Sequence, residues 1–237
     1  NASSDGTQEA LQKQFSDVEY IFNPTNLRFA GGNNVGIDYA LRKGADYILL
    51  LNNDTTVADN FLDELVSTAS TSLNVGIVGP KMYYHGDPNR IWYAGGKIEW
   101  WKGWISHVGV REIDNGQYGQ TIETDFVSGC CIFVKREVVE KVGMLDTAYY
   151  IYGEDVDWCI RASRAGYRIM YEPKAKIWHK LSVSTGGHLS WFKNWNKLKS
   201  QLKIMVRYAK WYQFFTIPFG IIFEIIKNYT KVRTSGF

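Results

Sequence analysis

One short apolar run constrains the fold of this chain more than any other stretch. Residues 47–51 read Tyr-Ile-Leu-Leu-Leu, and Asn52, Asn53 and Asp54 follow at once. A continuous apolar run of this length is typical of a strand buried on both faces of a parallel sheet. In open α/β sheets, ligands bind at the carboxyl ends of such strands. We therefore expect Asp54 at the mouth of a crevice, with Asn52 close by.

The polar residues after this run suggest a metal site. The carboxylate of Asp54 and the amide oxygen of Asn52 are ligands that suit Mg²⁺ or Mn²⁺, and these ions commonly also hold substrate phosphates. The same residues are equally typical of a turn after a strand. This motif alone leaves both interpretations open.

Predicted strands and helices alternate around the apolar run. Residues 18–22 are predicted as a strand, and residues 37–43 as a helix that stops at Gly44. Asp59 is a suitable cap for a further helix, and residues 75–80 form another apolar strand pattern. Alternation of this kind predicts an α/β fold with a parallel sheet and helices on its faces.

A glycine pair precedes the helix predicted at residues 37–43. Gly31 and Gly32, followed by Asn33, would allow close approach of a backbone to an anion at a helix N-terminus. The pattern matches neither a dinucleotide-binding fingerprint nor a P-loop, so a purely structural turn is an equal alternative.

Residues 81–120 break the alternation and are rich in aromatic residues and glycine. This composition predicts hairpins or a long loop. Aromatic faces suit sugar rings, but a small aromatic core under a loop is the alternative for any single ring. The aromatic residues concerned are Tyr83, Tyr84, Trp92, Tyr93, Trp100, Trp101 and Trp104.

A second group of polar residues lies at the predicted start of a helix. Glu154, Asp155 and Asp157 fall within four positions, and the helix continues to Gly166. Acids in a first turn are also favoured by the helix dipole alone. Neighbouring helical residues point in different directions, so we expect one of Glu154 and Asp155 to act as a base and the other to form hydrogen bonds.

Two further residues have open roles. Gly129 interrupts residues 124–135, which are predicted as two strand pieces, and indicates a bend or the close approach of a ligand. His179 follows a predicted strand, and a single histidine is more often structural than a ligand.

Composition limits the class of protein. The chain has 237 residues, enough for one sizeable core, and a net charge of +3, too weak to indicate nucleic-acid binding. Its three cysteines form no CxxC motif and no even-numbered disulfide framework, which favours a reducing, cytoplasmic location.

The tail, residues 186–237, has its own pattern. A basic amphipathic stretch precedes an almost entirely apolar block, residues 211–226, which Pro218 and Glu224 interrupt. The block is shorter than the roughly 20 residues of a transmembrane helix, so we expect an interfacial helix at the inner face of the plasma membrane, with Phe214, Phe215, Ile221 and Phe223 in the acyl boundary. A helix packed on the catalytic part or on a second subunit, as in a homodimer, is the alternative. The basic residues are Lys193, Lys197, Lys199, Lys203, Arg207 and Lys210.

Four stretches, taken together and in order, resemble family 2 glycosyltransferases of the rhamnosyltransferase-like kind. They are residues 1–7, 26–36, 50–54, and 152–157 with His179 downstream. The resemblance implies the GT-A fold, a Rossmann-like αβα sandwich with a mostly parallel sheet, over residues 1–185. The opening strand of the family and the acidic residue that usually precedes Asn1 are missing, so we expect an N-terminally truncated domain.

The resemblance also implies roles for single residues. Asp54 matches the last residue of the DxD motif, which holds a divalent metal, Mg²⁺ or Mn²⁺, on the donor diphosphate; Asn52 takes the first position and leaves one carboxylate fewer. His179 matches a histidine that completes this site in many members. Asp155 matches the catalytic base, with Glu154 in support. The positions implied to bind the donor are Ser4, Asp5, Gly32, Asn33, Asn52 and Gly129.

The resulting expectation is an inverting glycosyltransferase. Its partners would be a nucleotide-diphosphate sugar and a hydroxyl of a glycan or lipid-linked acceptor, with peripheral membrane contact. A nucleotidyltransferase shares the αβα plan and the use of metal, and a degenerate sugar-binding module is favoured if the truncation is real. A processive synthase is disfavoured because no Gln-x-x-Arg-Trp-like motif follows Asp155.

Overall fold

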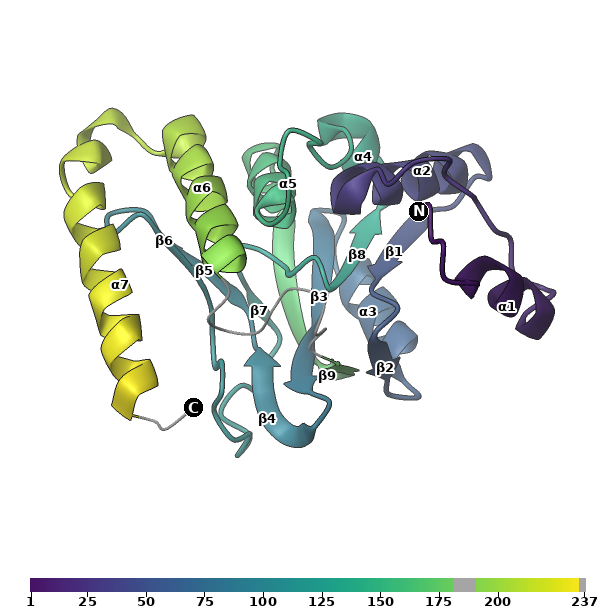
Figure 1. Ribbon diagram of the computed structural model, residues 1–237, viewed down its shortest axis with the longest axis horizontal. Coiled ribbons are helices and arrows are strands. Elements are labelled where there is room, and N and C mark those ends of the chain that lie inside the picture. Colours follow the sequence, from purple (N-terminus) through teal and green to yellow (C-terminus); the bar gives the residue numbers. More distant parts are fainter. Residues whose placement is uncertain (181–190, 235–237) are drawn as a thin grey trace.

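A seven-stranded mixed sheet forms the centre of the computed structural model, which describes residues 1–180 and 191–234 (Figure 1). The main path of the sheet runs β1 (Tyr47–Leu51), β8 (Cys131–Lys135), β3 (Val75–Tyr84), β9 (Arg168–His179) and β2 (Thr55–Val57). Two further strands join it: β4 (Asp87–Tyr93) pairs with β3, and β7 (Ile122–Glu123) pairs with β9.

The strand directions correct one expectation. The α/β class is confirmed, but the sheet is not mostly parallel: among the described pairs, only β3 and β9 run parallel. β8 lies between β1 and β3 and is antiparallel to both. The chain reaches β8 through an excursion of hairpins rather than a helical crossover, so it enters the sheet from the opposite end.

Helices cover both faces of the sheet. On one face lie α2 (Arg28–Arg42), α4 (Arg136–Val142) and α5 (Glu154–Arg164), and on the other lies α3 (Phe61–Ser70) (Figure 1). Adjacent strand residues point to opposite faces. Ile132 accordingly joins the core under α2, α4 and α5, whereas its neighbour Phe133 joins the core under α3. Two cores on one sheet make the αβα sandwich.

The aromatic-rich excursion consists of hairpins, as predicted. β3 and β4 form the first, and β5 (Gly96–Glu99) pairs with β6 (Trp104–His107) to form the second. Gly103, at φ +61°, belongs to the turn of the second hairpin.

The structure corrects two expectations near the N-terminus. Residues 18–22 form no strand, and Val18 is exposed. In the described sheet β1 is an edge strand that pairs only with β8, and residues 18–22 do not add to its free edge. The glycine pair is not a loop, because α2 already begins at Arg28 and contains Gly31 and Gly32. A separate helix, α1 (Thr7–Gln14), precedes these residues and buries no side chain.

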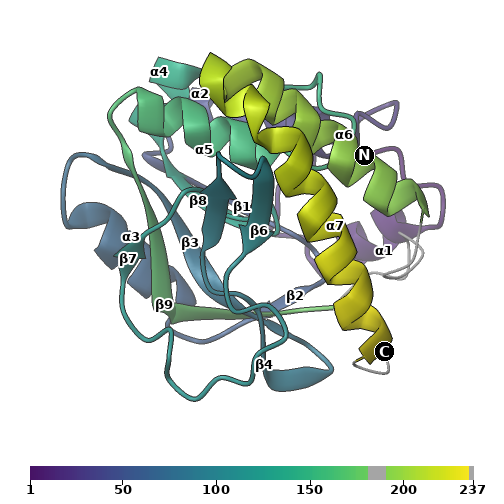
Figure 2. The same cartoon turned by 90° about the vertical axis from the view of Figure 1, so that its left-hand side faces the viewer.

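The C-terminal part forms α6 (Trp191–Tyr208), a 3₁₀ turn η2 (Trp211–Phe215) and α7 (Ile217–Thr234). α6 lies beside α5, and α7 packs along the β5–β6 hairpin (Figure 2). Within the described ranges, no helix is both long enough and apolar enough to cross a membrane. The expected domain boundary at residues 185 and 186 lies outside the described residues.

Candidate active site

Strand pairing brings Asp54 and His179 together. After β1 the chain turns at residues 52–54, and Thr55 Oγ1 donates a hydrogen bond of 2.7 Å to the Asn52 carbonyl oxygen. β2 then pairs antiparallel with the last residues of β9, which places Thr55 opposite His179. The distance between Asp54 Oδ1 and His179 Nε2 is 3.2 Å.

These two side chains fit a divalent cation. His179 Nδ1 is buried and has no hydrogen-bond partner among the described residues, and His179 Nε2 is the polar contact described for the buried Asp54 Oδ1. Buried polar atoms are normally satisfied, so such atoms indicate that a ligand is required there. No cluster of three or more His, Cys, Asp or Glu residues suited to a metal occurs in residues 1–180 and 191–234. An ion here would therefore complete its coordination with water, amide or substrate oxygens.

The surroundings of His179 favour its metal-binding form. Burial lowers the pKa of His179, while the neighbouring Asp54 carboxylate opposes this and Lys193 adds to it. The neutral imidazole is the form that binds metals. Trp92 packs edge-on against the ring, with 4.9 Å between ring centroids. Trp92 therefore supports the ring of His179. This role fits the alternative of a small aromatic core better than that of an exposed surface for a sugar ring.

The second half of the site is the start of α5. Tyr152 and Gly153 both have left-handed backbone angles, with φ of +68° and +90°. Such an angle is costly for a tyrosine and occurs where the surrounding structure enforces it. The turn directs Asp155 toward Gly129, whose backbone N–H donates to Asp155 Oδ2 at 2.7 Å.

Glu154 and Asp155 form a coupled buried pair with different surroundings. Burial raises the pKa of both carboxyl groups, and the charge of Asp155 raises that of Glu154 further. Asp155 accepts backbone N–H bonds from Gly129 and Val156, which favour its ionised form. Glu154 Oε2 is buried without a hydrogen-bond partner in the described structure. Asp155 is therefore the member that carries the negative charge, and Glu154 the one that holds the proton.

A dipeptide joins the two halves of the site. The N–H of Gly129 binds Asp155, and the carbonyl oxygen of Cys130 accepts a hydrogen bond of 3.0 Å from the backbone N–H of Asn52. A Cβ on Gly129 would lie only 3.3 Å from Asp155 Oδ2, so a glycine permits this approach. The predicted bend at Gly129 thus links the helix acid to the strand-end turn.

Asp157, the third acid of this helix, is structural. Its side chain is fully buried and has four polar partners. They are Arg161 at 2.7 Å, Tyr208 at 2.6 Å, Arg207 at 3.0 Å and Tyr149 at 3.2 Å. Two of them, Arg207 and Tyr208, belong to α6. Asp157 therefore fixes α6 against α5 and does not face the crevice.

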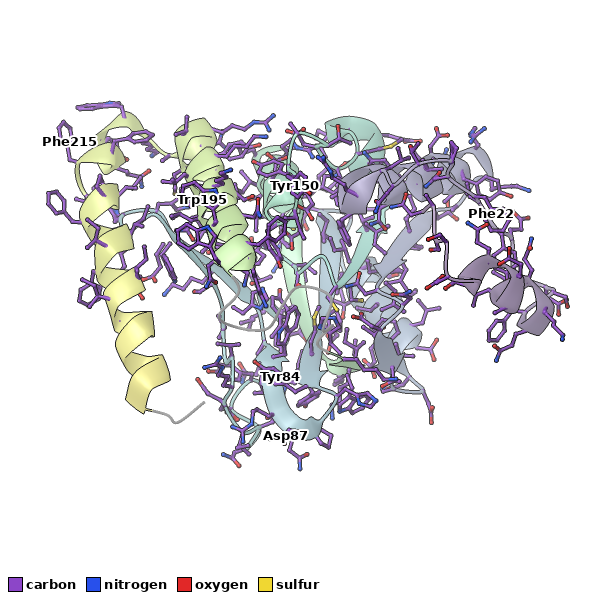
Figure 3. All side chains as sticks on the ribbon, viewed as in Figure 1. Phe22, Tyr84, Asp87, Tyr150, Trp195 and Phe215 are labelled. Carbon is purple, nitrogen blue, oxygen red and sulfur yellow. The ribbon has the colours of Figure 1, made fainter. Side chains whose placement is uncertain are left out.

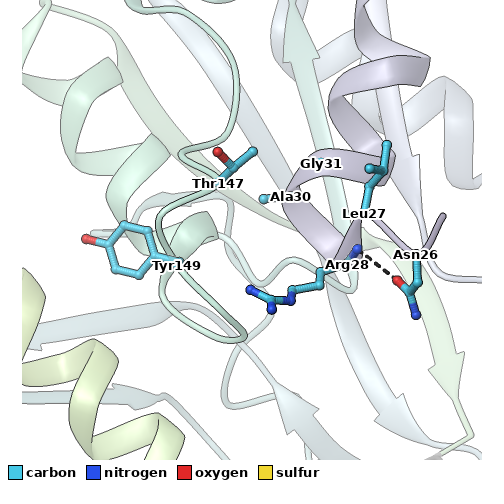
Figure 4. A pocket seen from close by; sticks show the side chains of 7 residues that line it. All are labelled: Asn26, Leu27, Arg28, Ala30, Gly31, Thr147 and Tyr149. Carbon is cyan, nitrogen blue, oxygen red and sulfur yellow. Dashed lines mark hydrogen bonds between the residues drawn. The ribbon is translucent and has the colours of Figure 1, made fainter.

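The start of α2 and the loop before α5 together form a small pocket. It has a volume of about 230 Å³ and is lined by Asn26, Leu27, Arg28, Ala30, Gly31, Thr147 and Tyr149 (Figure 4). The side chain of Asn1 accepts a hydrogen bond from Leu27 N–H at 3.0 Å and donates one to the Arg28 carbonyl at 3.1 Å. The Arg28 guanidinium lies 3.9 Å from the centre of the Tyr150 ring. The sequence motifs contained these residues but gave no signal for the contact between them.

The other predicted donor-binding residues have local partners. Asp5 Oδ1 accepts a hydrogen bond from Thr7 N–H at 3.1 Å at the start of α1, and Ser4 is exposed. Asn33 Nδ2 donates to the carbonyl oxygen of Phe29 at 2.9 Å within α2. A Cβ on Gly32 would lie 3.0 Å from Asn1 Nδ2. The group that comes close to this glycine is therefore a side chain of the protein itself. The structure does not bring these four residues to Asp54 or Asp155.

Comparison with known proteins identifies a family. A model of the family described as "Glycosyltransferase like family 2" matches residues 1–198. The chain is 27% identical over 155 residues to the Low-salt glycan biosynthesis hexosyltransferase Agl10 of Haloferax volcanii, covering 65% of this chain and 48% of that protein. It is 28% identical over 185 residues to the dTDP-rhamnosyl transferase RfbF of Shigella flexneri, covering 74% and 57%.

A third relative is the N-acetylglucosaminyl-diphospho-decaprenol L-rhamnosyltransferase of Mycobacterium tuberculosis. It is 25% identical over 210 residues, which cover 78% of this chain and 66% of that protein. The chain thus spans between 48% and 66% of the length of these three relatives.

Two solved structures share the fold. GalNAc-T7 with UDP, GalNAc and Mn²⁺ superposes with a TM-score of 0.66 at 16% identity, over 89% of this chain and 40% of that one. The mannosyltransferase PcManGT from Pyrobaculum calidifontis, in complex with GDP-Man and Mn²⁺, gives 0.55 at 18% identity, over 88% and 54%. Both are glycosyltransferases, and the predicted GT-A fold is confirmed.

Proposed function

Since the chain belongs to the glycosyltransferase like family 2, we propose that it forms the catalytic part of an inverting transferase that uses a nucleotide-diphosphate sugar. The observation that carries this proposal is the Gly129–Cys130 dipeptide, which ties Asp155 to the turn that holds Asp54. Through these two hydrogen bonds, one dipeptide would hold the proposed base and the proposed metal ligand in a common site.

Asp155 is the proposed base. In an inverting transfer, an acceptor hydroxyl oxygen attacks the anomeric carbon while the bond from that carbon to the diphosphate breaks. The proton of the hydroxyl passes to the carboxylate of Asp155, which its two backbone N–H donors keep ionised and oriented. A positioned base of this kind contributes about 10²–10⁴-fold to the rate.

Glu154 supports the base rather than replacing it. A carboxyl group that remains protonated beside Asp155 avoids two adjacent negative charges in a buried site. Its buried Oε2 atom has no partner in the described residues and is available to a substrate hydroxyl.

Asp54 and His179 are the proposed metal ligands, and the side-chain oxygen of Asn52, two residues before Asp54, is a further candidate donor. A bound Mg²⁺ or Mn²⁺ would stabilise the negative charge that develops on the departing diphosphate. Support comes from the contact between these two side chains, from the buried His179 Nδ1 atom, which has no partner among the described residues, and from the Mn²⁺ named with both solved relatives of the fold.

A lipid-linked acceptor at a membrane surface is the proposed destination of the sugar. One relative is named for a sugar-diphospho-decaprenol acceptor, and α7 presents exposed apolar side chains along one side. They are Phe219, Ile222, Phe223 and Ile226, and Trp211 and Phe215 of η2 add to them. Phe215 projects from the edge of the molecule farthest from α1 (Figure 3).

Calorimetric titration of dTDP, UDP and GDP into the protein tests the donor and metal assignment. In MnCl₂ at least one nucleotide should bind, and EDTA or the substitution Asp54→Ala should remove that binding. Asn53→Ala, in the same turn but exposed, is the matched control and should bind like the wild type. Absence of any binding, or binding indifferent to both EDTA and Asp54→Ala, would contradict the proposal.

A further inference from the structure

A second, larger cavity lies at the end of α5 that is remote from the proposed base. Its volume of about 690 Å³ is within the roughly 300–1,000 Å³ of small-molecule sites in proteins. Ile160, Ser163 and Arg164 of α5 line one side of it. At 1.5 Å per residue these positions lie roughly 7–14 Å along the helix from Asp155. The described lining includes neither Asp54 nor Asp155, so the cavity is separate from the proposed transfer site.

Aromatic rings from two other segments line the same cavity. Trp100 and Trp101 lie in the turn of the β5–β6 hairpin, and Tyr212 belongs to η2. The ring centroids of Trp101 and Tyr212 are 5.4 Å apart, with 34° between the ring planes. Trp101 remains 57% exposed beside this partner, so its ring is accessible to a ligand. A flat aromatic face of this kind can pack against the apolar C–H face of a sugar ring.

Two oriented polar side chains also line the cavity. Asp125 Oδ2 accepts a hydrogen bond of 2.7 Å from the backbone N–H of Ile98, and Asp125 is exposed. Arg164 Nη2 donates at 2.9 Å to the Tyr208 carbonyl oxygen, and the guanidinium lies 4.7 Å from the centre of the Tyr208 ring. A carboxylate accepts several hydrogen bonds and a guanidinium has several N–H donors, so both retain capacity for a ligand. A fixed acceptor and a fixed donor suit the hydroxyl groups around a sugar ring.

The charges in the lining favour an uncharged ligand. Two acids, Glu123 and Asp125, and two bases, Arg164 and Lys210, line the cavity. A cleft whose charges all have one sign concentrates ligands of the opposite sign, and this cleft has both signs in equal number. The lining therefore selects neither a phosphate nor a cation, which separates it chemically from the proposed site for a diphosphate.

We propose that this cavity binds an uncharged saccharide, which stacks on Trp101 and forms hydrogen bonds with Asp125 and Arg164. Such binding requires neither metal nor nucleotide. That the saccharide belongs to the acceptor or product glycan rests on the proposed function. A glycan that reaches from the cavity to Asp155 would gain affinity for the transfer site, because its second contact is intramolecular.

Ligand-observed NMR titration of the full chain tests this inference with uncharged probes. The probes are L-rhamnose, N-acetylglucosamine, mannobiose and chitobiose. Trp101→Ala removes the stacking face, Trp101→Phe returns an aromatic ring, and Arg164→Gln changes an exposed donor. Trp191→Ala is the matched control, because Trp191 is exposed, stacks on Trp195 and is not part of the described lining.

At least one probe should bind the wild type equally in EDTA and in MnCl₂. Trp101→Ala should raise the Kd for that probe about tenfold, and Arg164→Gln about fivefold. Trp101→Phe should recover most of the loss, and Trp191→Ala should bind like the wild type.

Absence of binding to the wild type, or an unchanged Kd in either Trp101→Ala or Arg164→Gln, would overturn the inference. A loss of saccharide binding confined to Asp155→Asn would also overturn it, because the sugar would then occupy the transfer site.

The nucleotide titration separates this inference from the proposed function. Metal-dependent nucleotide binding without saccharide binding would leave the proposed function standing and remove the cavity site. Saccharide binding at the cavity in a protein that binds no nucleotide would keep the cavity site and remove the transferase.

Discussion

The two C-terminal helices differ in composition and in what they expose. α6 is rich in basic residues: Arg207 pairs with Asp157, and Lys203 lies 4.1 Å from the centre of the Tyr149 ring, whereas Lys197 and Lys199 are exposed. α7 directs large apolar residues outward, with Phe219 75% exposed and Phe223 59% exposed. The two helices thus present different surfaces, a partly basic one on α6 and an apolar one on α7.

The attachments of the two helices explain this difference. α6 contributes Ile204 and Met205 to the core that also contains Trp158 of α5. α7 contacts the β5–β6 hairpin along a narrow stripe, where Gly220 lies against the backbone of Lys102. Just before the helix, the Thr216 hydroxyl donates a hydrogen bond of 2.6 Å to the Trp101 carbonyl oxygen. Both helices thus reach the same core, since Ile217 and Ile221 of α7 also belong to it, but α6 is fixed in addition by the buried carboxylate of Asp157.

The structure corrects one expectation about the tail. Ile221 was expected in the acyl boundary but is buried, because it lies on the inner stripe of α7. Of the basic residues of α6 expected near lipid headgroups, Arg207 forms ion pairs with Asp146 and Asp157, whereas Lys197 and Lys199 are exposed. A tail deletion that removes α6 would also expose the core, so it cannot test membrane binding.

The largest expected effect comes from removing the attachment of α6. Asp157→Ala leaves Arg161, Arg207 and two tyrosine hydroxyls without their shared acceptor in a buried site. We expect the free energy of unfolding to fall by about 3–5 kcal/mol, measured by urea denaturation.

Asp146→Ala is the matched control for that measurement. It removes the other carboxylate partner of Arg207, which is partly exposed, and should cost at most about 1 kcal/mol. Equal losses in the two variants would show that Asp157 does not fix α6.

A smaller effect is expected from the outer face of α7. The double variant Phe219→Ser/Phe223→Ser should keep the wild-type stability but lower partitioning onto phospholipid vesicles by about tenfold or more. Because the case for vesicle contact rests on these apolar side chains, salt should weaken vesicle binding less than this variant does. Leu73→Ser, which alters an 87% exposed residue after α3, is the control. Pelleting of the double variant equal to the wild type would remove the case for a membrane contact.

The sequence predicted the positions of the acids but not the long-range geometry. The apolar run before Asp54 and the acids at the start of α5 are local patterns, and such patterns mark strand ends and helix starts. The insertion of β8 between β1 and β3 depends on pairing between distant segments, which no local pattern encodes. The attachment of α6 to α5 depends in the same way on Asp157 and Arg207, which are 50 positions apart.

The central claim, that Asp155 is the base and Glu154 its protonated neighbour, is tested most directly by kcat. The substrate is whichever nucleotide sugar of a panel the wild type consumes, with release of nucleoside diphosphate as the signal. Because burial raises the pKa of Asp155, kcat of the wild type should fall as the pH drops through that raised value. Asp155→Asn should lower kcat by about 10²-fold or more, abolish this acid limb and leave donor affinity near wild type. Glu154→Gln should lower kcat less and retain the limb. A larger loss in Glu154→Gln than in Asp155→Asn, or an unchanged acid limb in Asp155→Asn, would contradict the account.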